Sequence, residues 1–477
     1  SVVDGGNAKV LQGDYELNNQ GVLELIDGSL TLRDTADLTN AGTFRFVQFD
    51  GTNPTGQANI SESGTGAAPS FVSSGTIEKT GSADLARIAV PSTIGGTVEV
   101  TDGTLRFDAV ASHGAAYTIG ALGAVEFLGS AQTLTTGSAF SGAGPLTLDG
   151  TPLAVTVDVP VDKLVLTGFG TIAGAGTVTV GDSFVWESGT IGNTADGGAL
   201  TLASGATGSI PSTTVKDLEN GTLTLDAGSS TTWGAGDIRL SEGAELNLAG
   251  TLDLDADAQL RDLDTGVPAF VQNTGTITRD TTTGTTTFDV LFDNDGRVEV
   301  SLGTLALLRD GTHDGDFVET DPGVIDFAAG THTITALGSF TTDRDRIFDA
   351  ETLVFDGSFG AGSVTIQNGS DLSFNGSYTT AATTITGGST ASFGGTATTD
   401  ALTVTGATLN GAGSLDVPGT ATLDGATFGG TLATTFGATS TVSGTGLDQA
   451  GAPATRFAGT TNLGQVNLGG GLIGLGH

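Results

Sequence analysis

Apolar and polar residues alternate along short stretches of this chain. In Leu252–Leu260, which reads LDLDADAQL, Leu and Ala take every second position, and Asp or Gln takes the positions between them. A period of two predicts a β-strand with one face toward a dry interior. Similar runs of about four to six residues lie between turns rich in Gly, Asn, Asp and Ser, without helical patterns between them. The pattern therefore predicts an all-β fold and disfavours a doubly wound sheet.

The alternating runs recur at regular spacings. Apolar triplets in the middle of the chain are spaced 23, 22, 23 and 23 residues apart, at Val155–Val157, Val178–Val180, Leu200–Leu202, Leu223–Leu225 and Leu246–Leu248. Near the C-terminus the step shortens to about 19 residues, at Ile366, Ile385, Val404 and Leu423. Two or three strands in each unit of about 19–23 residues predict a right-handed parallel β-helix, or β-solenoid, of about 20–22 coils. A β-sandwich of hairpins is the alternative.

A longer duplication overlies these coils. Gly96–Phe107 matches Gly296–Leu307, and Gly123–Thr135 matches Gly323–Thr335, each at an offset of 200. The duplicated stretches extend over about 71–135 and 270–335. Copying of coils is typical of a solenoid, so we predict one continuous solenoid over residues 1–477, with a shorter coil period in the section 361–477.

The charge balance excludes some partners. The chain has 16 Lys plus Arg against 53 Asp plus Glu, a net charge of −37. It therefore lacks the basic stripe that nucleic acid requires, and an anionic membrane surface would repel it. No stretch of 18 apolar residues occurs, so membrane insertion as a helix is not expected. Many short carboxylates along the chain favour adaptation to high salt, with an ordinary acidic protein as the alternative.

Composition also bears on location. The chain contains neither Cys nor Met, which excludes thiol catalysis and disulfides, and it starts at Ser1. These features favour a secreted, mature product from which a signal segment has been removed.

A resemblance to a protein class rests on three stretches. They are GTIEKTG at 75–81, GGTVEVTDGTLRF at 95–107 and GAVEFLGS at 123–130. Their cadence resembles the repeats of large secreted bacterial β-helix proteins, the filamentous-haemagglutinin and autotransporter-passenger type of surface adhesin. The resemblance implies an extracellular, cell-surface stalk, adhesin or matrix element without catalysis.

Candidate chemistry is sparse. The histidines are His113, His313, His332 and His477, of which His113 and His313 occupy equivalent places in the duplication, so we interpret them as parts of the repeat. His332 is predicted to face solvent. Oxygen ligands suit Ca²⁺, and Asp253, Asp255, Asp257, Asp293 and Asp295 are candidate calcium ligands. A solvated acidic strand face is the alternative for these residues.

These observations favour an extracellular structural protein of the cell surface or matrix over an enzyme. Solenoid ends carry unpaired strand edges, so we expect copies to join head to tail by β-augmentation into a fibre, without any cofactor unless calcium binds. An adhesin stalk that binds surface glycans is one alternative. A carbohydrate-active hydrolase or lyase is another, although Trp186 and Trp233 are the only tryptophans for a sugar groove. Glycosylation sequons lie at Asn59, Asn220, Asn368 and Asn375.

Overall fold

The computed structural model describes residues 2–4, 9–26, 28–47, 58–64, 68–81, 83–349, 351–437, 439–450, 454–458, 460–463, 466–469 and 472–475. His477 lies outside the described residues, as do parts of both terminal segments to which we assigned the end-to-end contact.

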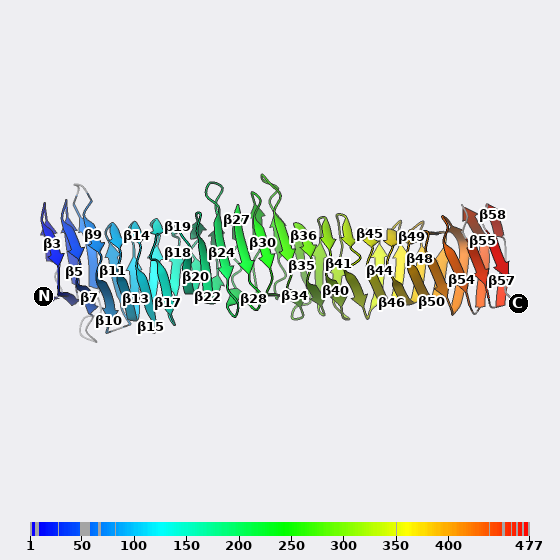
Figure 1. Cartoon of the computed structure of the whole chain (residues 1–477), viewed down its shortest axis with the longest axis horizontal. Coiled ribbons are helices and arrows are strands. Elements are labelled where there is room, and N and C mark those ends of the chain that lie inside the picture. The colour runs from blue at the N-terminus through cyan, green and yellow to red at the C-terminus, as the bar shows by residue number, and fades with distance from the viewer. Residues whose placement is uncertain are drawn as a thin grey trace. The chain divides into compact units, whose positions relative to one another are not determined.

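The chain is a parallel β-solenoid of about 20 turns with a period of about 21 residues. Its described residues form strands and turns without any helix (Figure 1). This confirms the predicted all-β solenoid, and the β-sandwich of hairpins is wrong because the strands pair in parallel. Within the described residues no helix is long and apolar enough to cross a membrane.

Backbone contacts divide the chain into two compact units. Unit 1 contains Ser1–Leu252 and Arg261–Phe270, and unit 2 contains Asp253–Leu260 and Val271–His477. Three short strands each contain residues of both units: β31 (Thr251–Leu254), β32 (Gln259–Asp262) and β33 (Phe270–Asn273).

In unit 1 most coils contribute to three ladders of parallel strands. The first comprises β1 (Val2–Asp4), β4 (Val22–Ile26), β7 (Thr43–Val47), β10 (Thr76–Thr80), β17 (Ala139–Gly142), β24 (Gly198–Leu202), β27 (Gly221–Leu225) and β30 (Glu245–Leu248). The second comprises β2 (Lys9–Gln12), β5 (Gly28–Arg33), β8 (Ala58–Ser63), β11 (Leu85–Ala89), β18 (Leu146–Asp149), β25 (Thr207–Ile210) and β28 (Ser230–Trp233). Four longer strands take part in both: β13 (Thr97–Phe107), β15 (Ala116–Leu128), β20 (Val159–Thr167) and β22 (Thr177–Trp186).

The third ladder of unit 1 forms a separate sheet, which we call the third sheet. It comprises β3 (Glu16–Asn19), β6 (Asp37–Asn40), β9 (Ser70–Ser73), β12 (Ser92–Ile94), β14 (Ala111–His113), β16 (Gln132–Leu134), β19 (Pro152–Val155), β21 (Thr171–Ala173), β23 (Gly189–Ile191), β26 (Lys216–Glu219) and β29 (Ile238–Ser241).

Unit 2 is built in the same way. One ladder holds β34 (Thr276–Arg279), β37 (Arg297–Val300), β40 (Asp316–Glu319), β43 (Ser339–Thr342), β52 (Ser414–Val417), β54 (Ala433–Phe436), β56 (Ala454–Phe457) and β59 (Leu472–Leu475). Another holds β36 (Leu291–Asn294), β39 (Gly311–His313), β42 (His332–Ile334), β45 (Thr352–Phe355), β47 (Asp371–Phe374), β49 (Thr390–Phe393), β51 (Thr408–Asn410) and β58 (Val466–Gly469). Longer strands complete both ladders: β46 (Ser358–Gln367), β48 (Tyr378–Thr386) and β50 (Thr396–Thr405) join β43 to β52, and β53 (Thr420–Phe428) and β55 (Thr439–Ala450) join β51 to β58. The other strands are β35 (Thr285–Asp289), β38 (Thr304–Leu307), β41 (Val324–Asp326), β44 (Asp345–Asp349) and β57 (Thr460–Leu463).

The apolar triplets stack in the interior, one coil above the next. Leu200 pairs with Leu223, and Leu223 pairs with Leu246, so these two steps of the sequence pattern are real coil lengths. The first step is wrong, because Val178 pairs with Val159 and Val155 lies in the third sheet. Alternation has the same period in every ladder, so it did not reveal which ladder Val155 belongs to.

The shorter coils near the C-terminus are confirmed. Ile366, Ile385, Val404 and Leu423 pair in succession. Beside them Phe355, Phe374 and Phe393 stack in a column, with ring centroids 5.2 and 5.6 Å apart. Aromatic stacking in register thus adds to the burial of the aliphatic residues.

Coil length varies while the strand pairing is kept. Phe44 pairs with Leu23 in the coil before it and with Ile77 in the coil after it. The second of these coils is much the longer, yet the strands stay in register on both sides. Registers also repeat at the offset of the duplication: Ile77 pairs with Val98, and Ile277 pairs with Val298.

Glycines stack at one corner because a side chain has no room there. A Cβ on Gly376 would lie 1.9 Å from the carbonyl oxygen of Gly357, and one on Gly357 would lie 2.0 Å from that of Gly338. Such contacts are far inside van der Waals distance, so this column accepts glycine alone.

The acidic run at 252–260 is two strands rather than one. Strand β31 ends at Leu254, and β32 starts at Gln259. The apolar residues of the run are all buried, so the inward face was predicted correctly, although the chain turns between the strands.

Candidate functional site

Among the predicted calcium ligands, Asp253 and Asp255 lie together in unit 2. A third carboxylate, from Asp280, joins them, and one ligand oxygen from each lies within 4.8 Å of the others. Burial raises the pKa of Asp253, a hydrogen bond from Thr278 lowers it, and the charges of Asp255 and Asp280 raise it further. Asp253 and Asp255 are half-buried and Asp280 is exposed, and a bound cation would relieve the repulsion among the three carboxylates.

The other predicted ligands lie elsewhere. Asp257 accepts a hydrogen bond of 2.7 Å from Arg279 Nη2. Asp293 accepts one of 2.8 Å from the backbone N–H of Thr312, and Asp295 accepts one of 3.3 Å from the amide of Gln272. The five candidates thus do not share one site. Sequence reasoning missed Asp280 because it comes from the next coil.

Arg279 holds the turn after β31 in place. Its side chain is fully buried, and Nη1 donates to the carbonyl oxygens of Leu254 at 3.2 Å and Ala256 at 3.1 Å. Because Nη2 also binds the carboxylate of Asp257, the guanidinium fixes the conformation of this turn.

His113 is buried in a network that satisfies both ring nitrogens. The amide nitrogen of Gln132 donates to the carbonyl oxygens of Ala109 and Ser130, so its Oε1 accepts from His113 Nε2 at 2.8 Å. Nδ1 then accepts from the hydroxyl of Tyr117 at 2.6 Å. Burial lowers the pKa of His113 to about 4, so it is neutral at neutral pH.

His313 and His332 form the corresponding pair in unit 2. Their rings stack, and His313 Nε2 lies 3.1 Å from His332 Nδ1. Burial lowers the pKa of both, that of His313 to about 3. The prediction that His332 faces solvent is wrong, since its exposure is 1%. A polar partner in the neighbouring coil makes this inward position acceptable.

A third buried polar group lies around Arg346. Its Nη1 is 3.3 Å from Glu319 Oε1, and Nη2 is 3.5 Å from Glu351 Oε2. The guanidinium also lies over the ring of Phe348, 4.7 Å from its centroid. Burial raises the pKa of Glu351 to about 7, despite the opposing effect of Arg346.

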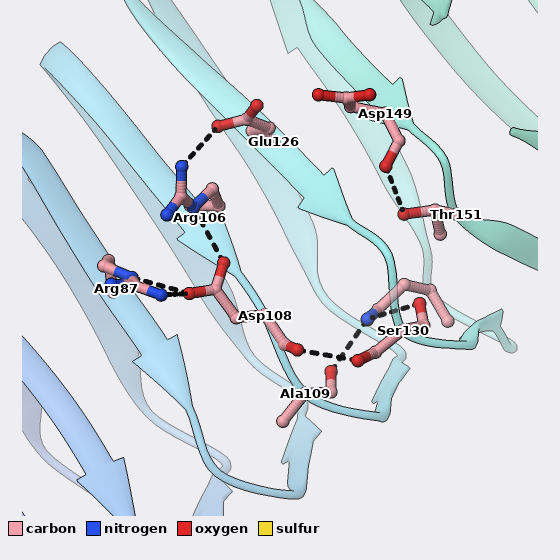
Figure 2. Close-up of polar contacts among 9 residues, drawn as sticks. Arg87, Arg106, Asp108, Ala109, Glu126, Ser130, Asp149 and Thr151 are labelled. Atoms are coloured by element: carbon pink, nitrogen blue, oxygen red, sulfur yellow. Dashed lines mark hydrogen bonds and ion pairs between the residues drawn. The ribbon is translucent and has the colours of Figure 1, made fainter. Parts of the chain in front are cut away.

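Ion pairs on the surface link successive coils. Figure 2 shows Arg87 and Arg106 converging on Asp108, with Nε to carboxylate distances of 2.6 and 2.7 Å, and Arg106 also reaching toward Glu126. The Oγ of Ser130 donates to the carbonyl oxygen of Asp108 at 2.7 Å. This arrangement pairs opposite charges on neighbouring coils.

The two tryptophans that could stack on a sugar do not lie on the surface. Trp186 and Trp233 are fully buried. Of the sequon residues, Asn59 is half-buried, and Asn220, Asn368 and Asn375 are exposed.

The N-terminal coil presents strand edges. Strands β1, β2 and β3 pair with β4, β5 and β6 respectively, and within the described residues each pairs along one edge. Exposed apolar side chains accompany these edges: Val2 at 58%, Val10 at 50% and Tyr15 at 71%. In general, a strand edge with apolar neighbours is suited to the addition of another strand.

Comparison with known proteins finds no family model that matches the chain and no curated protein that resembles it significantly.

Proposed function

We propose that this protein is an extracellular structural element of the cell surface or matrix whose copies join head to tail into a fibre. The observation that carries the proposal is the N-terminal coil, whose strands pair along one edge and are flanked by Val2, Val10 and Tyr15. A parallel strand from another copy would continue the same ladders without a new type of contact.

The charge supports assembly in concentrated salt. A net charge of −37 makes copies repel one another. The screening length falls from about 10 Å at 0.1 M to about 3 Å at 1 M salt, so axial contact becomes easier as salt rises. Contacts of this kind do not close on themselves and therefore generate an open filament.

Negative-stain electron microscopy and light scattering at low and molar NaCl test the proposal. Wild-type protein should form filaments in molar salt. The Val10→Glu variant should not, because a carboxylate then lies on the strand edge. The matched control is Leu337→Glu, at a residue of 79% exposure in a turn of unit 2, which should leave filaments intact. Wild-type protein that remains monomeric at every salt concentration would refute the head-to-tail assembly.

A further inference from the structure

Among the described residues, one face of unit 1 presents outward positions without a charged side chain. It is formed by the third sheet from β9 to β21, where the outward positions of the strands form a row in register: Val72, Thr93, Ser112, Thr133 and Ala154. The flanking outward residues are Ser70, Val110, Pro152 and Thr171. We call these nine residues the neutral face.

Acidic residues lie at both ends of the neutral face. Glu16 and Asp37 lie on β3 and β6, and Asp196 and Asp217 lie beyond β21. The other ladders of the same coils carry ions, such as the Arg106 group in Figure 2. In a chain of net charge −37, the neutral face therefore differs from its surroundings.

The neutral face is hollowed rather than convex. A hollow of about 490 Å³ is lined by residues that include Thr133, Pro152 and Ala154, and Asp196 beyond β21 also lines it. A second hollow of about 250 Å³ is lined by residues that include Val110 and Ser112, and it shares Thr133 with the first. Val110 is 58% exposed and Val72 is 39% exposed, so apolar side chains project beside the hollows.

We propose that the neutral face binds the neutral face of a second copy of this chain, as a two-fold symmetric pair. Approach of two copies through the acidic surroundings brings carboxylates together, whereas this face brings Thr, Ser, Ala and Val together. Small side chains on a sheet allow close packing of two sheets, about 10 Å apart. The face has neither the aromatic rings that stack on sugars nor charges that select a charged ligand, which favours a copy over those partners.

The area of the face sets the strength of the pair. Six strands about 4.8 Å apart and three or four residues long cover about 330 Å², so the pair would bury about 650 Å². Stable interfaces bury about 1,200–2,000 Å², so we expect a weak pair. Its affinity should rise with salt, which screens the repulsion between the surrounding acids.

The pair does not depend on the head-to-tail contact. A two-fold contact uses the same surface on both copies and stops at two, whereas the end contact continues. If both contacts form, filaments associate in pairs.

Cysteine crosslinking tests the pair directly, because the chain contains no Cys. Ser112 and Thr133 lie at the centre of the face, so a mixture of Ser112→Cys and Thr133→Cys proteins should form disulfide-linked dimers under mild oxidation in molar NaCl. The matched control is Thr179→Cys, at an outward, half-buried threonine of the first ladder. We expect at least tenfold more dimer from the mixture than from the control. Equal yields would overturn the proposal.

Sedimentation equilibrium of Val10→Glu protein measures the pair with the strand edge blocked. We expect a monomer–dimer equilibrium between 47.2 kDa and twice that mass in molar NaCl. Adding Thr133→Glu should weaken dimerisation at least tenfold, and adding Thr179→Glu should leave it unchanged, with circular dichroism confirming that both variants fold. A mass of 47.2 kDa at every salt concentration, or equal effects of the two substitutions, would overturn the pair. Loss of filaments in Val10→Glu protein, by contrast, reports on the head-to-tail contact alone.

Discussion

Acidification should destabilise unit 1 through a single histidine. His113 is the only histidine of residues 1–270, and its buried ring is hydrogen-bonded at both nitrogens, where burial disfavours the charged form. The unfolded chain takes up a proton below about pH 6.5, whereas the folded protein does so only below about pH 4. The stability contributed by the neutral ring is therefore complete above pH 6.5 and is lost as the pH falls to about 4.

The magnitude follows from the two pKa values. Moving a pKa from 6.5 to about 4 corresponds to about 3 kcal/mol, because each unit is about 1.4 kcal/mol. That is a large part of the stability of a typical domain, about 5–15 kcal/mol.

Tryptophan fluorescence during urea titration measures the unfolding of unit 1, because Trp186 and Trp233 are the only tryptophans of the sequence and both lie in that unit. Carboxylates titrate in the same pH range, so the informative quantity is the difference between wild type and His113→Gln, a variant without a titrating ring. Wild type should lose about 3 kcal/mol more than the variant between pH 7 and pH 4. Identical pH dependence in the two proteins, or an imidazole pKa near 6.5 by NMR, would refute the reasoning.

Three further predictions concern unit 2. Glu351→Gln should stabilise the protein by about 3 kcal/mol above pH 7. Native Glu351 holds its proton up to about pH 7, so wild type loses stability as the pH rises from 4.5 to about 7, and the glutamine variant does not. Thermal melts at pH 4 and pH 8 measure this difference, and equal shifts of the midpoint in both proteins would contradict it. Phe374→Ala should lower the free energy of unfolding by about 3–5 kcal/mol, because it leaves a cavity between Phe355 and Phe393 in the aromatic column. Urea unfolding followed by circular dichroism measures this, and a loss below about 1 kcal/mol would mean that neighbouring side chains fill the cavity. Gly376→Ala should lower the free energy of unfolding by about 1–3 kcal/mol in the same measurement, because the added methyl group clashes with the carbonyl oxygen of Gly357. An unchanged unfolding midpoint would show that the backbone adjusts at this position without loss.

The strands themselves are readable from sequence because burial follows their period of two. Leu223 and Leu225 are inward and Thr224 is outward, as alternation requires. Which coil lies above which depends on corner lengths, and these carry no periodic signal. This is why Val155 was placed in the wrong ladder and why Asp280 was not grouped with Asp253.

Buried polar residues were harder to predict than the apolar ones. His332 was expected outside because polarity alone argues for solvent, yet His313 in the preceding coil gives it a partner. The neutral face does have a signal in the sequence, a long stretch almost without charge. Residues 109–148 contain Glu126 as their only charged residue, in a chain of net charge −37.

The long coil between Phe44 and Ile77 shows how such a chain can change without losing its fold. It is much longer than the coil from Leu23 to Phe44, yet the strands at both of its ends keep their pairing. Length can thus vary between strands and is fixed along a strand, because the strands carry the ladder hydrogen bonds. A chain of this kind can therefore gain or lose residues between strands during evolution while the neighbouring coils retain their register.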